Sequence, residues 1–260
     1  IFGEGTRRRV VNISPYLTDG PDTVVQTAER SISGCPKMIM GNMARDEGNL
    51  ILSREEARSL RSEYPSADGL LLPLLGTKEI VDGVPRVALH LDDQSKAIWS
   101  SVPPIVERVE AVRKFRNDSK AKTTNGYANV AHRFAQYCHK NEEAIALPSV
   151  TPEGRAYVTP LLLPKRVMVT NLAYLIYGFG TELFSLLSSR MHIVWVEAVS
   201  GRLGSGVRYT PTVSYHTFPI PTLTDQNKAD LTRCAEDILL AREAHFPATI
   251  ADLYDPGTMP

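Results

Sequence analysis

The segment TPEGR carries side chains whose types and spacing suit contact with a nucleic acid. Glu153 and Arg155 lie two residues apart and Tyr157 follows at the same interval, so an extended segment would put all three on one face. An arginine can donate two hydrogen bonds to O6 and N7 of guanine, and a glutamate can accept one from N4 of cytosine. The spacing would allow Glu153 and Arg155 to read one C·G pair while Tyr157 packs against a base or sugar. The alternative is a solvated turn with a Glu153–Arg155 salt bridge and Tyr157 in the core.

Two other segments offer cations for phosphate groups. The loop SKAKTT carries Lys120 and Lys122 beside neutral hydroxyl donors and has no apolar periodicity. The loop SGRLGSGVRY carries Arg202 and Arg208 among glycines, where main-chain N–H groups can approach a phosphate closely. Phosphate contacts fix the register of a protein on a duplex without reading its sequence. The four residues are predicted phosphate contacts; a solvated charge run and a structural hairpin are the respective alternatives.

Patterns for catalysis are missing from the sequence. There is no glycine-rich loop after a strand to hold a methyl donor. The Asn/Asp-Pro-Pro-aromatic tetrapeptide that would grip a flipped base is also absent, because Val102 precedes Pro103-Pro104. The three cysteines are isolated, no histidine pair has metal-ligand spacing, and Asp92-Asp93 with Lys96 is a poor nuclease candidate. No catalytic residue, metal site or cofactor is therefore predicted for this chain.

Charge is balanced over the chain but unevenly placed. The 260 residues have a formal net charge of zero, which argues against a wholly basic nucleic-acid coat protein. Lysines and arginines dominate residues 108–140, whereas acids dominate from Asp225 to the end, so one face can meet phosphate. No run of about 18–20 apolar residues suggests a membrane span, no signal peptide is visible, and unpaired cysteines fit a cytoplasmic location.

The elements that would position these side chains begin with two helices and a strand pair. Ser53 and Glu56 match a capping box and predict a helix that ends near Tyr64. Strands are predicted at LLLPLLG and PRVALHL, joined through the turn signal Asp82-Gly83. Pro103-Pro104 opens a helix to about Arg116. ANVAHRFAQYC reads as a short helix, and EEAIALPSV as a strand that leads into TPEGR.

Two long helices are predicted toward the C-terminus. One covers about Thr181 to Ser200, with an apolar stripe at helical spacing formed by Leu183, Leu186, Leu187, Met191, Val194, Trp195 and Ala198. A Gly-rich loop and a short Thr/Val/Tyr strand follow it. The other helix covers about Asp225 to Ala244, with Leu231, Cys234, Ala235 and Ile238 on one face.

These elements predict an α+β fold. Mixed, mostly antiparallel short strands are surrounded by helices and followed by a helical C-terminal portion. We expect a target-recognition domain over residues 1–168 and a mostly helical region over 169–260 packed on it.

The order LLSSRMHIVWV, then YHTFPIP, resembles the target-recognition part of single-chain type IIL/IIG restriction-modification enzymes. NISPYLTDG, PKMIMGNMARDEGNLILS and LPSVTPEGRAYV extend the resemblance over nearly the whole chain. It implies double-stranded DNA as a partner, read by base-specifying side chains in the TPEGR loop. It also implies a methyltransferase domain elsewhere in a longer parent chain, which would use S-adenosylmethionine to modify adenine at N6. An endonuclease activity of that parent chain is a further implication. The rival reading, favoured by the neutral net charge, is a free-standing protein-interaction domain without nucleic-acid binding.

Overall fold

The chain divides by its internal contacts into two units, each built from separate segments. The structure, a computed structural model, describes residues 2–3, 6–7, 9–15, 19–20, 22 and 24–259. The first unit comprises Ile1–Ile39, Ala144–Leu162 and Ile176–Pro260, and the second comprises Met40–Glu143 and Leu163–Leu175. This division differs from a single boundary at residue 168, and the assignment of recognition to residues 1–168 stays a prediction.

The second unit contains a four-stranded mixed sheet with the order β10-β5-β6-β4. Its strands are β4 (Ile51–Leu52), β5 (Leu71–Leu75), β6 (Arg86–Leu89) and β10 (Met168–Val169). As predicted, β5 and β6 pair antiparallel, with Leu72 opposite Ala88; β10 joins β5 in parallel. The predicted tight turn between them is wrong: the connection is helix α2 (Thr77–Asp82), and Gly83 at φ 69° ends that helix.

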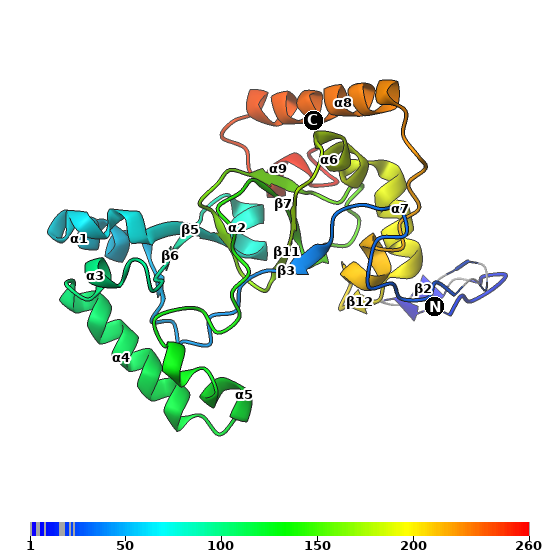
Figure 1. The fold of residues 1–260 in the computed structure, drawn as a ribbon. Coiled ribbons are helices and arrows are strands. Elements are labelled where there is room, and N and C mark those ends of the chain that lie inside the picture. The colour runs from blue at the N-terminus through cyan, green and yellow to red at the C-terminus, as the bar shows by residue number, and fades with distance from the viewer. Residues whose placement is uncertain are drawn as a thin grey trace. The chain divides into compact units, whose positions relative to one another are not determined.

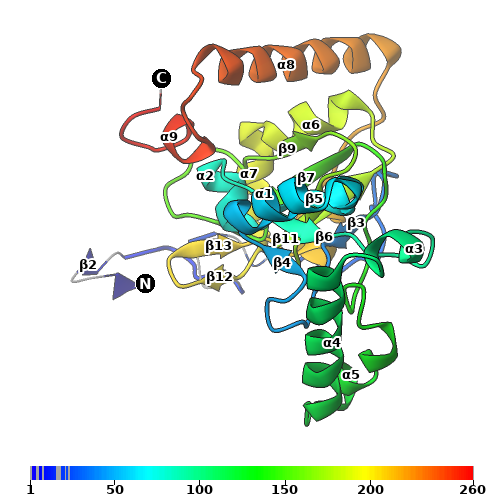
Figure 2. The ribbon, with the colours of Figure 1, turned by 90° about the vertical axis from the view of Figure 1, so that its left-hand side faces the viewer.

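The other helices of the second unit cluster around an apolar core. They are α1 (Arg54–Glu63), the 3₁₀ turn η1 (Pro65–Leu70), α3 (Lys96–Trp99), α4 (Pro103–Asp118), α5 (Lys122–Asn125) and the 3₁₀ turn η2 (Ala128–Val130). The predicted capping box is confirmed. Glu56 N donates a hydrogen bond of 3.1 Å to Ser53 Oγ, and Ser53 N donates one of 2.7 Å to Glu56 Oε2. Helix α4 confirms the Pro103 prediction and buries Ile105, Val109 and Val112 in the core. Helix α5 lies beside the end of α4 (Figure 2).

The first unit holds a three-stranded antiparallel sheet and most of a second sheet. The former has the order β12-β13-β8, from β8 (Val150–Thr151), β12 (Arg202–Leu203) and β13 (Gly206–Arg208). The latter has the order β3-β11-β7-β9, from β3 (Met38–Met40), β7 (Ala144–Pro148), β9 (Leu161–Leu163) and β11 (Ala173–Tyr177). The chain passes between units within β3, β9 and β11. A short hairpin pairs β1 (Phe2–Gly3) with β2 (Thr6–Arg7).

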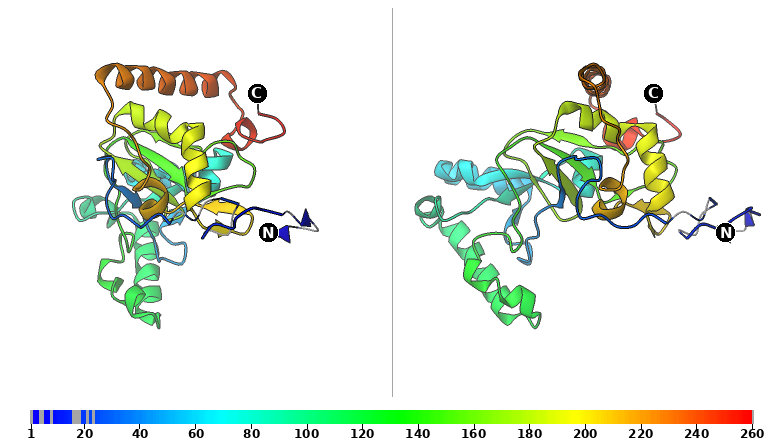
Figure 3. Two further views of the ribbon diagram at one scale, coloured as in Figure 1. Left: turned by 90° about the vertical axis from the view of Figure 1, so that its right-hand side faces the viewer. Right: turned by 45° about the vertical axis from the view of Figure 1, so that its right-hand side comes forward.

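The helices of the first unit are α6 (Thr181–Ser188), α7 (Arg190–Val199), the π turn η3 (Pro211–Tyr215), α8 (Asp225–Ala244) and α9 (Ile250–Leu253). Helix α8 has the predicted bounds and runs along α6 (Figures 1 and 3). Its contact face includes buried Ala235, whereas Cys234, predicted on that face, is exposed. The mixture of helices and mostly antiparallel strands confirms the α+β class.

Three local predictions are wrong. The single helix over 181–200 is broken at Ser189, which has extended dihedrals and caps α7 by accepting from His192 N. The Thr/Val/Tyr strand stops at Arg208, because the chain turns into η3 at Pro211. The helix predicted at ANVAHRFAQYC is only the turn η2.

Candidate functional site

The TPEGR segment is a tight turn at the end of β8. Gly154 has φ 79°, a backbone conformation that residues other than glycine rarely adopt, and it reverses the chain between Glu153 and Arg155. Glu153 is therefore exposed, while Arg155 is only 8% exposed. The expectation of one shared face is wrong, because it assumed an extended chain. Tyr157 is half-buried, with its ring centroid 6.3 Å from that of Tyr254.

Arg155 is a buried cation whose Nη1 has no hydrogen-bond partner among the described residues. Burial lowers the pKa of its guanidinium, and the negative charge of Asp255 opposes that shift. Nothing in the described part of the chain shows an ion pair between Glu153 and Arg155, so the salt-bridged alternative is not the observed arrangement. A buried donor without a partner costs free energy, and Nη1 itself is shielded from solvent.

The arginine hairpin joins the same small sheet as the TPEGR turn. In the ladder, Val207 lies opposite Thr151 and Arg208 opposite Val150. Arg208 and Arg202 are both exposed, and Arg202 Nη1 donates 3.2 Å to Ser205 O within the hairpin turn. The structure thus places two predicted phosphate contacts in a three-stranded sheet and the predicted base-reading residues in the turn that follows one of its strands, β8.

Helix α7 supports this sheet through a buried histidine. His192 Nε2 lies 3.0 Å from the Tyr209 hydroxyl, and its ring packs edge-on against Phe218 at 4.5 Å. Burial lowers the pKa of His192 to about 3, so the imidazole is neutral at pH 7. Sequence reasoning missed His192 because the predicted stripe ran through Met191 and Val194, which are exposed.

Lys120 and Lys122 lie in the second unit. Both are exposed, Lys120 between α4 and α5 and Lys122 at the start of α5. Arg45, a residue that sequence reasoning missed, joins this group: its Nη1 donates to the hydroxyls of Thr123 and Thr124 at 2.9 and 3.0 Å. Arg45 has φ 47°, a strained value for a residue with a side chain. The result is a compact group of cations with neutral hydroxyl donors.

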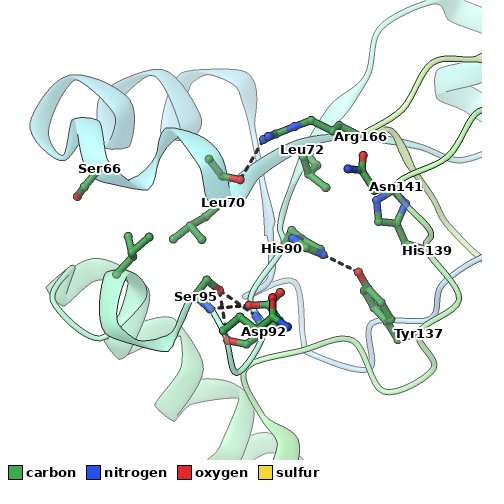
Figure 4. A pocket seen from close by; sticks show the side chains of 13 residues that line it. Ser66, Leu70, Leu72, His90, Asp92, Ser95, Tyr137, His139, Asn141 and Arg166 are labelled. Atoms are coloured by element: carbon green, nitrogen blue, oxygen red, sulfur yellow. Dashed lines mark hydrogen bonds between the residues drawn. The ribbon is translucent and has the colours of Figure 1, made fainter.

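A pocket of about 550 Å³ opens elsewhere in the second unit (Figure 4). His90 Nε2 hydrogen bonds to the Tyr137 hydroxyl, and His139 lies edge-on to His90. Burial lowers the pKa of both histidines, that of His139 to about 4, so both imidazoles are neutral and weakly basic at pH 7. The charged residues Asp92 and Arg166 also line the pocket. Its lining residues come from 66 to 166, a spread that no sequence motif reveals.

Asp92, which belongs to the weak nuclease pattern Asp92-Asp93 with Lys96, lines this pocket. The Asp92 carboxylate accepts from Ser95 N at 2.6 Å and Asp93 is mostly exposed, so the two carboxylates serve different roles. Among the described residues there is no group of three or more His, Cys, Asp or Glu side chains that could hold a metal ion. Helices able to cross a membrane are likewise lacking in that part of the chain.

The first unit therefore combines exposed arginines with a turn that carries a buried guanidinium, and arginine side chains can contact phosphates and base edges in a nucleic acid. Residues 19–222 match the model of the family described as MmeI, target recognition domain. The chain belongs to this family.

Full-length similarity supports that membership. The chain is 35% identical over 260 residues to DNA methyltransferase A of Bacillus subtilis (strain 168), covering 100% of the chain and 30% of that protein. It matches the structure of the type IIL restriction-modification enzyme MmeI in complex with DNA with a TM-score of 0.92 and 31% identity, covering 99% of the chain and 34% of MmeI. The chain thus spans about a third of the length of these relatives.

A more distant match indicates the fold alone. The type IIG restriction endonuclease BpuSI matches with a TM-score of 0.50 and 14% identity over 77% of the chain.

Proposed function

We propose that this chain recognises a short sequence in double-stranded DNA on behalf of an adenine-N6 methyltransferase domain in the same parent chain. The observation that carries the proposal is Arg155: a guanidinium more than nine-tenths buried, with an unpaired Nη1, at a turn flanked by exposed arginines. An arginine side chain can donate two hydrogen bonds to the O6 and N7 edge of guanine. The DNA-bound structure of the similar enzyme MmeI supports the same reading.

Each predicted residue takes a role in this proposal. Glu153 and Arg155, which leave the turn on different sides of Gly154, read a C·G pair, and Tyr157 packs beside them. The phosphate contacts come from the exposed cations Lys120, Lys122, Arg202 and Arg208. We add Arg45, because its guanidinium is tied to the hydroxyls beside Lys122.

The parent chain would supply the chemistry. The similarity to a DNA methyltransferase supports S-adenosylmethionine as the cofactor of that chain. The parent chain would act in the cytoplasm. Catalysis by the described residues is not part of the proposal. Recognition would lie mainly within residues 1–168, with 169–260 as a supporting region. The rival, a protein-interaction domain without DNA binding, has no comparable observation behind it.

The experiment is a mobility shift with duplex DNA across a salt series, followed by selection from a randomised duplex library. We expect the logarithm of the binding constant to fall with the logarithm of salt concentration by about 0.9 for each phosphate neutralised. We also expect the selected duplexes to share a motif. No shift with any duplex, or binding without a motif, would refute the proposal.

A further inference from the structure

The segment after α9 lies against the TPEGR turn. A Cβ built on Gly154 would sit 3.7 Å from Cγ of Pro256, and the rings of Tyr157 and Tyr254 meet edge to face at an interplanar angle of 75°. Asp255 supplies the negative charge that acts on Arg155. Residues 254–256 lie beyond the range matched by the family model, which ends at residue 222.

One arginine ties this segment to the turn. Arg242 of α8 donates through Nη1 to Pro160 O at 2.8 Å, and through Nε and Nη2 to the Tyr254 hydroxyl at 3.0 and 2.8 Å. Its guanidinium also lies over the Phe184 ring of α6, 5.4 Å from the centroid. A single side chain therefore joins α6, α8, the residue before β9 and the C-terminal segment.

The turn is held from its other side as well. Arg190 at the start of α7 donates to Ala156 O at 2.9 Å. The carboxylate of Asp255 is itself fixed, since its Oδ1 accepts from Gly257 N at 2.8 Å. The negative charge beside Arg155 thus has a defined place before any ligand arrives.

We propose that Arg242, Tyr254 and Asp255 are positioning residues for base reading by Arg155, and that the C-terminal segment is the back wall of the recognition turn. The inference rests on the proposed function. Pro256 and Tyr254 lie against Gly154 and Tyr157, which flank Arg155, so the C-terminal segment fixes the backbone that carries the guanidinium. A donor ordered in advance avoids the entropy cost of being ordered on binding, which sharpens discrimination.

The test compares the base preferences of full-chain variants by library selection. Arg155→Ala first identifies the base pair that the turn reads. Tyr254→Phe keeps the ring packing and loses the hydroxyl acceptor, Asp255→Asn removes the charge, and Arg242→Lys cannot reach both acceptors at once. Each is expected to reduce discrimination at that one pair by about fivefold or more, with binding to unselected duplex and the melting temperature near wild type. Arg233→Ala is the control, because it removes an exposed arginine of the same helix.

The outcomes separate the two proposals. Unchanged preference at that pair in all three variants, or an even loss of affinity at every position, overturns the positioning role. If Arg155→Ala alters no position although wild type selects a motif, the reading role of the turn fails and the positioning role fails with it. A wild-type chain that selects no motif contradicts the proposed function itself.

Discussion

The Arg116 side chain donates through Nε to the main-chain carbonyl of Arg45 at 2.9 Å. Arg116 is fully buried at the end of α4, and its other N–H groups donate to the carbonyls of Ala44, Tyr127, Val130 and Arg133. Burial lowers the pKa of this guanidinium and Asp46 opposes the shift. The cation thus fastens the segments on both sides of α5, the helix beside which the candidate phosphate contacts lie.

Arg116→Ala is expected to lower the free energy of unfolding by about 3 kcal/mol or more, because five partly buried main-chain carbonyls lose a hydrogen bond from the guanidinium. Arg116→Lys keeps three N–H donors, so its free energy of unfolding should fall between those of wild type and Arg116→Ala. Urea unfolding at 25 °C measures the change. Arg113→Ala on the same helix removes only an exposed pair with Glu110 and should stay within about 0.5 kcal/mol of wild type. Equal effects of both alanine variants would contradict this role.

Lys120→Ala and Lys122→Ala should each weaken binding by a similar factor on all DNA sequences. Each should also lower the salt slope by about 0.9, since one phosphate contact is lost. Anisotropy titrations at several salt concentrations measure both quantities. Lys228→Ala, in the acidic stretch of α8, is the control and should leave the slope unchanged. A changed base preference at constant slope would mean that the lysines read bases instead.

Local signals predicted the elements whose ends are set by adjacent residues. The Ser53–Glu56 capping box and the Pro103 helix start are examples, because both depend on contacts within one turn. The helix over 181–200 fails for a related reason. Ser189 restarts the helical phase, so the buried face of α7 is formed by His192, Ile193, Val196 and Val199 and not by the stripe counted from Leu183. A prediction that counts one uninterrupted helical repeat along the sequence cannot detect such a break.

The candidate site divides in the same way. The chemistry of Glu153 and Arg155 could be named from residue types, but the turn at Gly154 and the neighbouring C-terminal segment depend on tertiary contacts. Likewise, glycines and arginines marked the 202–208 hairpin, whereas its pairing with β8 joins residues 56 and 58 positions apart in the chain. Arg45 had no signal, because its partners are Thr123 and Thr124.

The stability of the chain should fall as pH drops below about 6.5, in part through His192. Its folded pKa of about 3 lies below the ordinary value of 6.5, so between these values the unfolded chain binds a proton that the folded chain excludes. The stabilisation is therefore complete above 6.5 and is lost toward pH 3, by up to about 1.4 kcal/mol per pH unit. Urea unfolding between pH 7.5 and 4.5 should show a shallower pH dependence for His192→Gln. His245→Gln, at an exposed position, should keep the wild-type dependence; identical slopes for wild type and His192→Gln would exclude this contribution.

The sharpest prediction separates reading from stability at the TPEGR turn. Glu153→Ala and Arg155→Ala should each lower discrimination at a single base pair by about 1–3 kcal/mol and leave other positions intact. Library selection with the full chain, or the methylation motif of the parent, measures this. An unchanged motif in both variants, at normal stability, would mean that the turn only shapes the fold.

Arg155→Met distinguishes a role of this arginine in reading DNA from a role in stabilising the fold. The guanidinium is buried with an unpaired Nη1, so an apolar side chain of similar length should raise the free energy of unfolding, by about 1 kcal/mol, while base discrimination is lost. A residue kept for the fold would give the opposite sign, because its replacement would destabilise the chain. If Arg155 serves to contact guanine, Arg155→Met should raise the free energy of unfolding and lower base discrimination. A lower free energy of unfolding in Arg155→Met would contradict that role.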